Sequence, residues 1–509
     1  MSSWTSGYVA EVGYTHGFYR ELTPALLCQI ALAKGVRGPS GSAPLTYCEL
    51  GCGQGFSANL IAAANPHIQV FATDFNPAHI LGARSLAAEA ETGNVQFFDQ
   101  SFHDFVDEPS LPAFDIISLH GIYSWITPGN RDDIVEFIRR KLKPGGLVYI
   151  SYNALPGWAA GMPLRQLFAQ HADTTSGPIL PRVDAALDFV GKLRSSNAAF
   201  FRANASVGSR LDQIMKHDRR YLAHEYFNAE WNPFYYAEVA RDLEAAKLAY
   251  LGSANLMDDI SEVNLTTDQA ALLESIGDPA LRETVRDYIV NQQFRRDVFI
   301  KGRVEMTSWE VQHRWLDNRF GLSTLRSEIP LKVNGALGEA TLHAEVYGPI
   351  LDSLADGPRT LREMMTDASM TGRTVMQVAR ALCVLMGAGR VEPCLDAEGE
   401  ETRAQSARRF NTAIMKRARF STELTHLASP TTGGGIAVPR FSQLFLLAEQ
   451  EGHADAPNYV WDVLSEQGQR LVKDGKVIEG AKGNLAELAS LHQTFVAQQL
   501  PVLKQLDIA

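Results

Sequence analysis

The chain has 509 residues, more than one hydrophobic core usually supports, so we expect two or three domains. Hydrophobic residues make up 45% and charged residues 21%, as in folded globular proteins, which argues against long disordered regions. The net charge is −11 and there is no Lys/Arg-rich block, signal peptide or apolar run of bilayer length. We therefore expect a cytoplasmic protein without a nucleic-acid or membrane partner.

Strand and helix patterns alternate through the first third of the chain. After a helical run over 24–32, strand patterns occupy residues 45–50, 68–73, 95–98, 114–119 and 147–152. The clearest helix between them, 131–142, has apolar residues on one face and is closed by Lys-Pro-Gly-Gly. This alternation predicts an α/β fold in which residues 1–160 form a doubly wound, Rossmann-like domain.

The remaining chain predicts a helical region and then a mostly α-helical domain. Residues 161–305 are mainly helical, and late strand patterns at 248–251 and 297–301 are expected to return to the same sheet. Beyond residue 331, helical patterns at 341–355 and 373–386 precede a short strand pattern at 389–392, which suggests a winged-helix-like unit within a C-terminal domain, 331–509.

A glycine-rich turn follows the first predicted strand. Residues 49–55 read Glu-Leu-Gly-Cys-Gly-Gln-Gly, in which Gly51, Gly53 and Gly55 allow a sharp turn and a close approach of a ligand to the main chain. The spacing E-x-G-x-G-x-G differs from the G-x-G-x-x-G of dinucleotide-binding proteins and resembles the first motif of class I methyltransferases dependent on S-adenosylmethionine (SAM). This disfavours a dinucleotide oxidoreductase and predicts SAM as the cofactor.

Acidic residues at the strand ends support this prediction. Asp74 ends the second strand about where doubly wound folds place the acid that binds ribose hydroxyls. By resemblance to the methyltransferases, Asp99 would meet the adenine amino group and Glu49 would lie near the methionine ammonium group. Five scattered cysteines without a Cys-x-x-Cys pair predict reduced thiols and no metal site.

Polar and aromatic residues follow the fourth and fifth strands, where ligands bind in open α/β sheets. We therefore expect them to contact the methyl acceptor. The candidate catalytic residues are His120, Tyr123, Tyr152 and Asn153, with His120 also assigned to the cofactor side. Trp125 and Trp158 are the candidates for an acceptor pocket, because aromatic faces attract ammonium groups.

Longer motifs give a more specific resemblance. The segments His-Gly-Ile-Tyr-Ser-Trp at 120–125 and Ser-Tyr-Asn-Ala-Leu-Pro-Gly-Trp at 151–158 resemble SAM-dependent methyltransferases with a methyltransferase regulatory domain. Residues 221–226, 231–235 and 294–297 are similar to the regulatory segment itself. Among these proteins are rickettsial lysine methyltransferases that act on outer-membrane proteins, so the resemblance implies N-methylation of lysine in a protein.

Two other functions fit the same motifs. A methyltransferase acting on a small molecule needs the same cofactor site, and the helical region would then form a lid over a metabolite. A regulatory or scaffolding protein could bind SAM without transferring its methyl group, using the C-terminal domain for partner contacts. The sequence leaves open the acceptor, the number of methyl groups added, a possible homodimer and the role of the C-terminal domain.

Overall fold

The computed structural model describes residues 8, 9, 11, 13 and 16–509. One central sheet of seven strands has the order β3-β2-β1-β4-β5-β7-β6. Strands β1 to β5 are parallel, whereas β7 is antiparallel to both β5 and β6. The strands are β1 (Leu45–Leu50), β2 (Ile68–Asp74), β3 (Val95–Asp99), β4 (Phe114–Leu119), β5 (Leu142–Asn153), β6 (Leu248–Ser253) and β7 (Phe294–Lys301).

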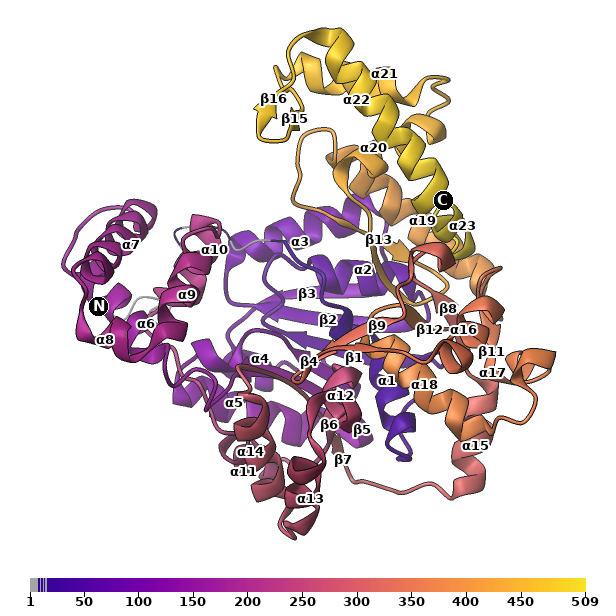
Figure 1. The fold of residues 1–509 in the computed structure, drawn as a ribbon, viewed down its shortest axis with the longest axis horizontal. Coiled ribbons are helices and arrows are strands. Elements are labelled where there is room, and N and C mark those ends of the chain that lie inside the picture. Colours follow the sequence, from indigo (N-terminus) through magenta and orange to yellow (C-terminus); the bar gives the residue numbers. More distant parts are fainter. Residues whose placement is uncertain (1–7, 10, 12, 14–15) are drawn as a thin grey trace.

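Helices cover both faces of this sheet, which confirms the predicted doubly wound α/β fold (Figure 1). Since β1 lies between β2 and β4, the connections on its two sides leave in opposite directions and open a crevice at the carboxyl ends of these strands. The helices of this part are η1 (Arg20–Leu22), α1 (Pro24–Ala33), α2 (Phe56–Ala64), α3 (Pro77–Glu89), α4 (Phe102–Val106), η2 (Tyr123–Trp125) and α5 (Pro128–Lys141).

The fifth strand begins earlier than its sequence pattern suggests. Helix α5 ends at Lys141, and the Lys-Pro-Gly-Gly segment expected to close it lies in β5. Leu142 pairs with Phe114 before a register shift, after which Leu147 pairs with Ile116. The two glycines therefore lie in an irregular stretch between paired residues of β5, which the hydrophobic pattern cannot assign to a strand.

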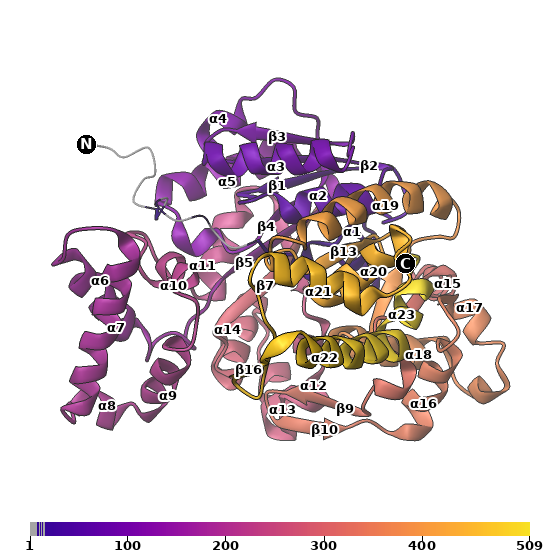
Figure 2. The ribbon, with the colours of Figure 1, turned by 90° about the horizontal axis from the view of Figure 1, so that it is seen from above.

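Six helices lie between β5 and β6, and the first five form a lobe with its own hydrophobic cluster, at the left of Figure 1 and Figure 2. They are α6 (Met162–Asp173), α7 (Ile179–Ser195), α8 (Ala199–Ala203), α9 (Ala205–Ile214), α10 (Arg219–Tyr226) and α11 (Tyr236–Glu244), of which α11 packs back on β6. The β6–β7 connection contains η3 (Leu256–Asp259), α12 (Ser261–Asn264), α13 (Thr267–Ser275) and α14 (Pro279–Val290).

The chain after β7 first forms small sheets and short helices. Its three-stranded sheet has the order β11-β8-β12, so the middle strand comes from upstream of the predicted boundary at residue 331. The winged-helix-like assignment and the domain boundaries stay predictions. The elements are α15 (Ser308–Asp317), β8 (Arg319–Leu322), η4 (Arg326–Glu328), β9 (Lys332–Gly335), β10 (Gly338–Thr341), α16 (Ala344–Ser353), β11 (Arg359–Thr360), α17 (Leu361–Met364), η5 (Ala368–Met370), α18 (Val375–Gly387) and β12 (Val391–Cys394).

The last part of the chain covers α2, whose nine residues are all buried. A helix that is mostly apolar around its circumference has to be covered on every side, and here α2 packs against the sheet and against α19. The last part of the chain and the domain of the central sheet consequently share one hydrophobic cluster. The elements are α19 (Glu400–Arg417), β13 (His426–Ser429), β14 (Gly434–Ala437), α20 (Arg440–Gln450), α21 (Ala456–Glu466), β15 (Val472–Lys473), β16 (Lys476–Val477), α22 (Gly480–Thr494), η6 (Phe495–Gln499) and α23 (Leu500–Gln505).

In the part of the chain that the structure describes, no helix combines the length and apolarity required to span a membrane.

Candidate functional site

The glycine turn after β1 is held against the end of β2. The main-chain N–H groups of Gly51 and Cys52 donate to the carbonyl oxygen of Thr73, at 2.8 and 3.0 Å. Gly51, Gly53 and Gly55 all have positive φ angles, of 70°, 54° and 66°. A Cβ at Gly51 would lie 2.5 Å from Ile122 and one at Gly55 2.4 Å from Ala83, whereas one at Gly53 would meet nothing within 4 Å. Packing therefore requires the outer glycines, and the middle one borders open space.

That open space belongs to a cavity, here called the central cavity, at the carboxyl ends of β1, β2, β3 and β4. Half of the residues named from the sequence line it, namely Glu49, Gly51, Gly53, Asp74, His120 and Trp125. The other half are not among its lining residues: Gly55, Asp99, Tyr123, Tyr152, Asn153 and Trp158. The roles predicted for both groups stay predictions, and the geometry of each residue follows.

Two buried carboxylates face the central cavity. One oxygen of Asp74 accepts from the N–H of Gly53 at 2.9 Å and the other from the N–H of Asn76 at 2.9 Å, so its orientation is fixed. Glu49 is 5% exposed, and its Oε2 has no hydrogen-bond partner among the described residues. Burial, together with the nearby charge of Asp74, raises the pKa of Glu49 to about 8. A cationic ligand would compensate this carboxyl group.

The end of β3 presents a different residue than expected. Asp99 pairs with Asp74 in register but is exposed, whereas the following Gln100 and Ser101 line the central cavity. The Nε2 of Gln100 donates to Glu108 at 2.9 Å, and its Oε1 is buried without a partner in the described structure. Gln100 thus offers a free acceptor at the position that the sequence assigned to Asp99.

His120 lies at the end of β4 with its ring between two tyrosines. It stacks on Tyr19 with 3.7 Å between ring centroids, and its Nδ1 is 2.8 Å from the hydroxyl oxygen of Tyr149. Burial lowers the pKa of His120 to about 4, so the imidazole is neutral at pH 7. A neutral imidazole can accept a hydrogen bond from a ligand in the cavity.

The side chain of Tyr152 has its partner elsewhere, whereas the Nδ2 of Asn153 is buried without a hydrogen-bond partner among the described residues. Successive strand residues point to opposite faces, and Ser151 lies on the face of His120, with its Oγ 3.4 Å from His120 Nδ1. Tyr152 is completely buried and its hydroxyl donates to Asp297 on β7 at 2.6 Å. Asn153 is 4% exposed and its main-chain N–H donates to Ser124 Oγ at 2.9 Å.

The remaining aromatic candidates pack in cores. The buried Tyr123 donates through its hydroxyl to Asp242 at 3.2 Å. Trp158 lies 4.9 Å from Trp231 in the hydrophobic cluster of the helical lobe, and the guanidinium of Arg210 covers its ring at 3.5 Å. Trp125 belongs to the same cluster but also lines the central cavity.

Several lining residues were not named from the sequence, among them Tyr8, Tyr19, Phe75 and His79. The ring of Tyr8 lies 5.7 Å from Phe75 and 5.5 Å from His224 of α10, so the N-terminal segment connects the sheet with the helical lobe. Its richness in aromatic residues was the available signal, but the contacts join positions more than 60 residues apart in sequence. Among the described lining residues there is no lysine or arginine.

Comparison with known proteins agrees with this geometry. Residues 48–148 match the family model described as a methyltransferase domain, and residues 218–301 match the predicted methyltransferase regulatory domain. "Uncharacterized protein sll1526" of Synechocystis sp. is 45% identical over 507 residues, 100% of both chains. "Uncharacterized protein RP028" of Rickettsia prowazekii is 31% identical over 184 residues, which are 35% of this chain and 70% of that protein.

The same fold occurs in PKMT2 from Rickettsia typhi, solved in complex with AdoHcy. The TM-score is 0.70 at 19% identity, over 95% of this chain and 98% of that chain. The lining of the central cavity suits SAM. Glu49 and Gln100 each present a buried oxygen atom without a partner among the described residues, and the space beside Gly53 is open. The chain therefore belongs to the SAM-dependent methyltransferases that contain a methyltransferase regulatory domain, with SAM as the cofactor.

Proposed function

We propose that the chain methylates the side-chain amine of lysine in a protein. The observation that supports an amine acceptor is the composition of the central cavity. Apart from Glu49 and Asp74 on the cofactor side, its described lining contains several aromatic rings but no lysine or arginine. Such walls favour cations and disfavour acceptors with phosphate or carboxylate groups.

The cofactor is assigned to the half of the cavity formed by β1, β2 and β3. When bound, SAM supplies a methyl group on a positively charged sulfur. Glu49 would bind the methionine ammonium group, Asp74 the ribose hydroxyls, and the main chain at Gly53 would lie against the ligand. For the adenine amino group we propose the free Oε1 of Gln100, in place of the exposed Asp99.

His120 and Trp125 are assigned to the acceptor side, next to Tyr19. A lysine amine has a pKa of about 10.4 in water, so only about one in 2,500 is neutral at pH 7. Burial next to a sulfonium lowers the pKa of the amine, and the neutral His120 can accept a hydrogen bond from it. The aromatic rings of Tyr19 and Trp125 would hold the alkylammonium product by cation–π attraction worth about 0.5–2 kcal/mol.

Tyr123, Tyr152, Asn153 and Trp158 would act indirectly on this site. Asn153 holds Ser124 in the segment between His120 and Trp125, and Tyr152 fixes β5 beside β7. Direct contact of these four residues with the acceptor stays a prediction from the sequence: none of them lines the central cavity, although the buried Nδ2 of Asn153 has no partner among the described residues.

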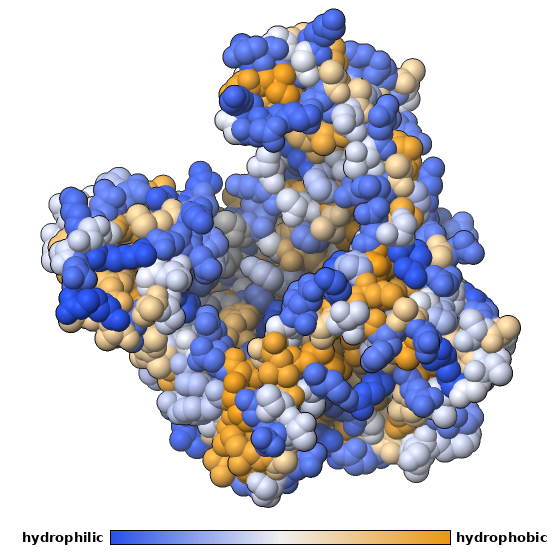
Figure 3. Space-filling view, viewed as in Figure 1, coloured by the Kyte–Doolittle hydropathy of each residue, from blue (hydrophilic) through white to orange (hydrophobic). Residues whose placement is uncertain are grey.

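A protein acceptor is favoured over a small molecule by the surroundings of the cavity. Figure 3 shows a deep notch between the helical lobe and the lobe of α20–α22. Of the residues that line the central cavity, His79 belongs to α3 and Tyr8 packs against His224 of α10. The name PKMT2 of the structural neighbour and the motif resemblance to rickettsial lysine methyltransferases favour the same acceptor class.

The experiment is incubation of the purified chain with methyl-labelled SAM and a lysate of the source cell, followed by mass analysis. The proposal predicts label in protein, on the Nζ atoms of lysine, and none with an Asp74→Ala control. Label only in small molecules would support the small-molecule alternative. Binding of SAM without any labelled product would support a regulatory or scaffolding protein.

A further inference from the structure

A second cavity, here called the polar cavity, lies at the same edge of the sheet beyond β6 and β7. Because β7 is antiparallel to β5, its first residue, Phe294, pairs with Asn153, the last residue of β5. The cavity is bordered by the β6–β7 connection, by the start of β7 and by the turn between β9 and β10. Its lining residues are mainly polar or charged, and most of them belong to the segment that matches the regulatory-domain model.

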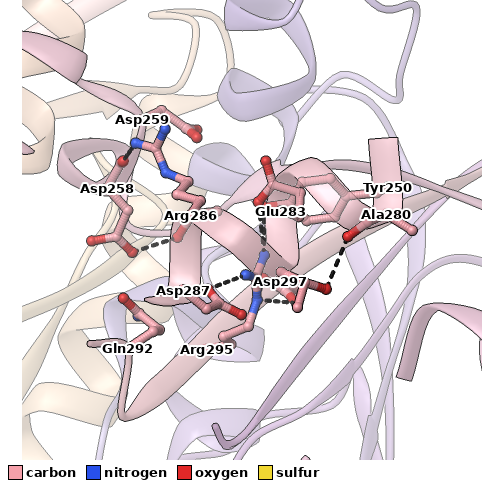
Figure 4. A network of polar contacts seen from close by, with 12 residues as sticks. Tyr250, Asp258, Asp259, Ala280, Glu283, Arg286, Asp287, Gln292, Arg295 and Asp297 are labelled. Carbon is pink, nitrogen blue, oxygen red and sulfur yellow. Dashed lines mark hydrogen bonds and ion pairs between the residues drawn. The ribbon is translucent and has the colours of Figure 1, made fainter. Parts of the chain in front are cut away.

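Negative charge exceeds positive charge at the floor of this cavity. The buried guanidinium of Arg295 contacts three carboxylates, those of Glu283 at 3.1 Å, Asp287 at 2.6 Å and Asp297 at 2.9 Å (Figure 4). The neighbouring Arg296 is paired with Glu21 at 2.8 Å, and Arg286 of the lining donates to the carbonyl oxygen of Asp258, so neither is paired with these acids. One paired cation among two buried acids and a partly buried one leaves room for a second cation.

Asp287 has the free acceptor atom. Its Oδ1 accepts from Arg295, but its Oδ2 is buried and without a hydrogen-bond partner in the described structure. The residue is only 2% exposed and lines the polar cavity. An unpaired carboxylate oxygen in such a position costs free energy that a hydrogen-bond donor would recover.

The walls of the cavity are fixed by hydrogen bonds. The main-chain N–H of Ala336 donates to Asn264 Oδ1 at 2.8 Å, and the side chain of Asn264 donates to the carbonyl oxygens of Met257 and Ile260. The turn packs so closely that a Cβ on Gly335 would lie 2.2 Å from the carbonyl oxygen of Val263. The polar cavity is thus built by the β9–β10 turn closing on the β6–β7 connection.

The arrangement does not suit a metal ion. Among the described residues, no group of three or more His, Cys, Asp or Glu side chains could hold one. Two further acids of the lining are occupied: Asp258 accepts from Ser253 Oγ at 2.8 Å and Asn255 Nδ2 at 2.7 Å, and Asp259 is paired with Lys34 at 2.9 Å. The free site is a single carboxylate oxygen in a polar cavity, which suits a hydrogen-bonding organic cation.

We propose that the polar cavity binds a primary ammonium group, with Asp287 Oδ2 as its charged acceptor. The group can belong to a free amine or to a lysine side chain. This site is separate from the central cavity and does not depend on the acceptor proposed for methylation.

Calorimetric titration of the full chain with butylammonium tests the proposal, with 1-butanol as the neutral probe of similar shape. At about pH 8.5 the amine is still charged and Asp287, whose pKa burial raises to about 7, is ionised. We expect saturable binding of butylammonium only. Asp287→Asn removes a charge-assisted hydrogen bond, so its affinity for butylammonium should be roughly 10- to 100-fold lower. No binding, or equal binding of butanol, would overturn the proposal.

Matched variants separate binding from folding. Glu274→Gln removes an exposed acid of α13 outside the cavity and should bind butylammonium like the wild type. Asn334→Trp places a large side chain at an exposed position of the cavity lining and should block binding without removing a partner of Arg295. Unchanged affinity in both Asp287→Asn and Asn334→Trp would refute the site.

A second probe, lysine with both its α-amino and carboxyl groups blocked as amides, distinguishes the source of the ammonium group. Binding of both probes assigns the cavity to amines and lysine side chains, and binding of butylammonium alone assigns it to free amines. Titration of the same samples with AdoHcy reports on the central cavity, so failure of one site is distinguishable from failure of the other.

Discussion

The hydroxyl of Tyr152 donates a 2.6 Å hydrogen bond to Asp297, and the same carboxylate accepts from Arg295. Both residues of the pair are completely or almost completely buried, so the bond joins β5 to β7 inside the core. We predict that Tyr152→Phe lowers the free energy of unfolding by about 1–3 kcal/mol, because it leaves a buried carboxylate with one donor fewer. Urea denaturation measures this change.

The exposed Tyr288→Phe is the control and should change the free energy of unfolding by less than about 0.5 kcal/mol. The kcat of Tyr152→Phe, measured under conditions where the variant is folded, decides a separate question. An unchanged kcat would exclude the catalytic role that the sequence predicts for this hydroxyl.

The glycine turn offers a matched pair of substitutions. Gly53→Ala requires a non-glycine residue at a positive φ angle, which costs about 1–2 kcal/mol, but its methyl group meets no protein atom within 4 Å. Gly55→Ala has the same strain plus contacts of 2.4 Å with Ala83 and 2.9 Å with Phe97, so about 1–3 kcal/mol more is expected. Thermal unfolding should give the lower Tm for Gly55→Ala.

Gly53→Ala should instead weaken AdoHcy binding at least about tenfold, because its methyl group enters the space assigned to the ligand. Equal Tm values for the two variants, or wild-type affinity of Gly53→Ala, would show that this turn is not shaped as described.

The buried carboxyl group of Glu49 should make the free energy of unfolding depend on pH. Its pKa rises from 4.5 in the unfolded chain to about 8 in the folded chain, so the folded chain retains a proton that the unfolded chain has released. The free energy of unfolding of the ligand-free chain should therefore fall as the pH rises from about 4.5 to about 8. Glu49→Gln should reduce this slope, which urea denaturation at several pH values measures.

SAM binding should reverse this effect, since a cation next to Glu49 favours the ionised form. At pH 7 we expect the release of up to about one proton on binding, detected by calorimetry in buffers of different ionisation enthalpy. Heats that do not depend on the buffer would contradict the contact between Glu49 and the ligand.

The sequence predicted the first four strands to within one residue at each end, because Gly, Pro and polar turns bound them and helical patterns separate them. The same local signals identified Glu49, Asp74 and His120, which lie directly at strand ends on the cavity. Tyr152 shows the limit of this reasoning: position at a strand end is visible in the sequence, but the face to which the side chain points depends on register.

Other parts of the site depend on contacts between distant segments. Tyr8 reaches the cavity because it packs between Phe75 and His224, and no periodic pattern encodes that contact. Trp158 packs against Trp231 in the helical lobe, although its motif suggested an acceptor pocket. Gln100 lines the cavity in place of its neighbour Asp99, a difference of one residue that depends on where β3 ends.

Calorimetric titration with AdoHcy tests the central claim most directly, because AdoHcy should bind only if the contacts proposed for its adenosyl half and for its amino-acid half are both present. The account predicts one site per chain, and an affinity lowered roughly 10- to 100-fold by Asp74→Asn, which removes a charged acceptor from the ribose hydroxyls. Absence of measurable binding to the folded wild-type chain would contradict the assignment of the central cavity to SAM.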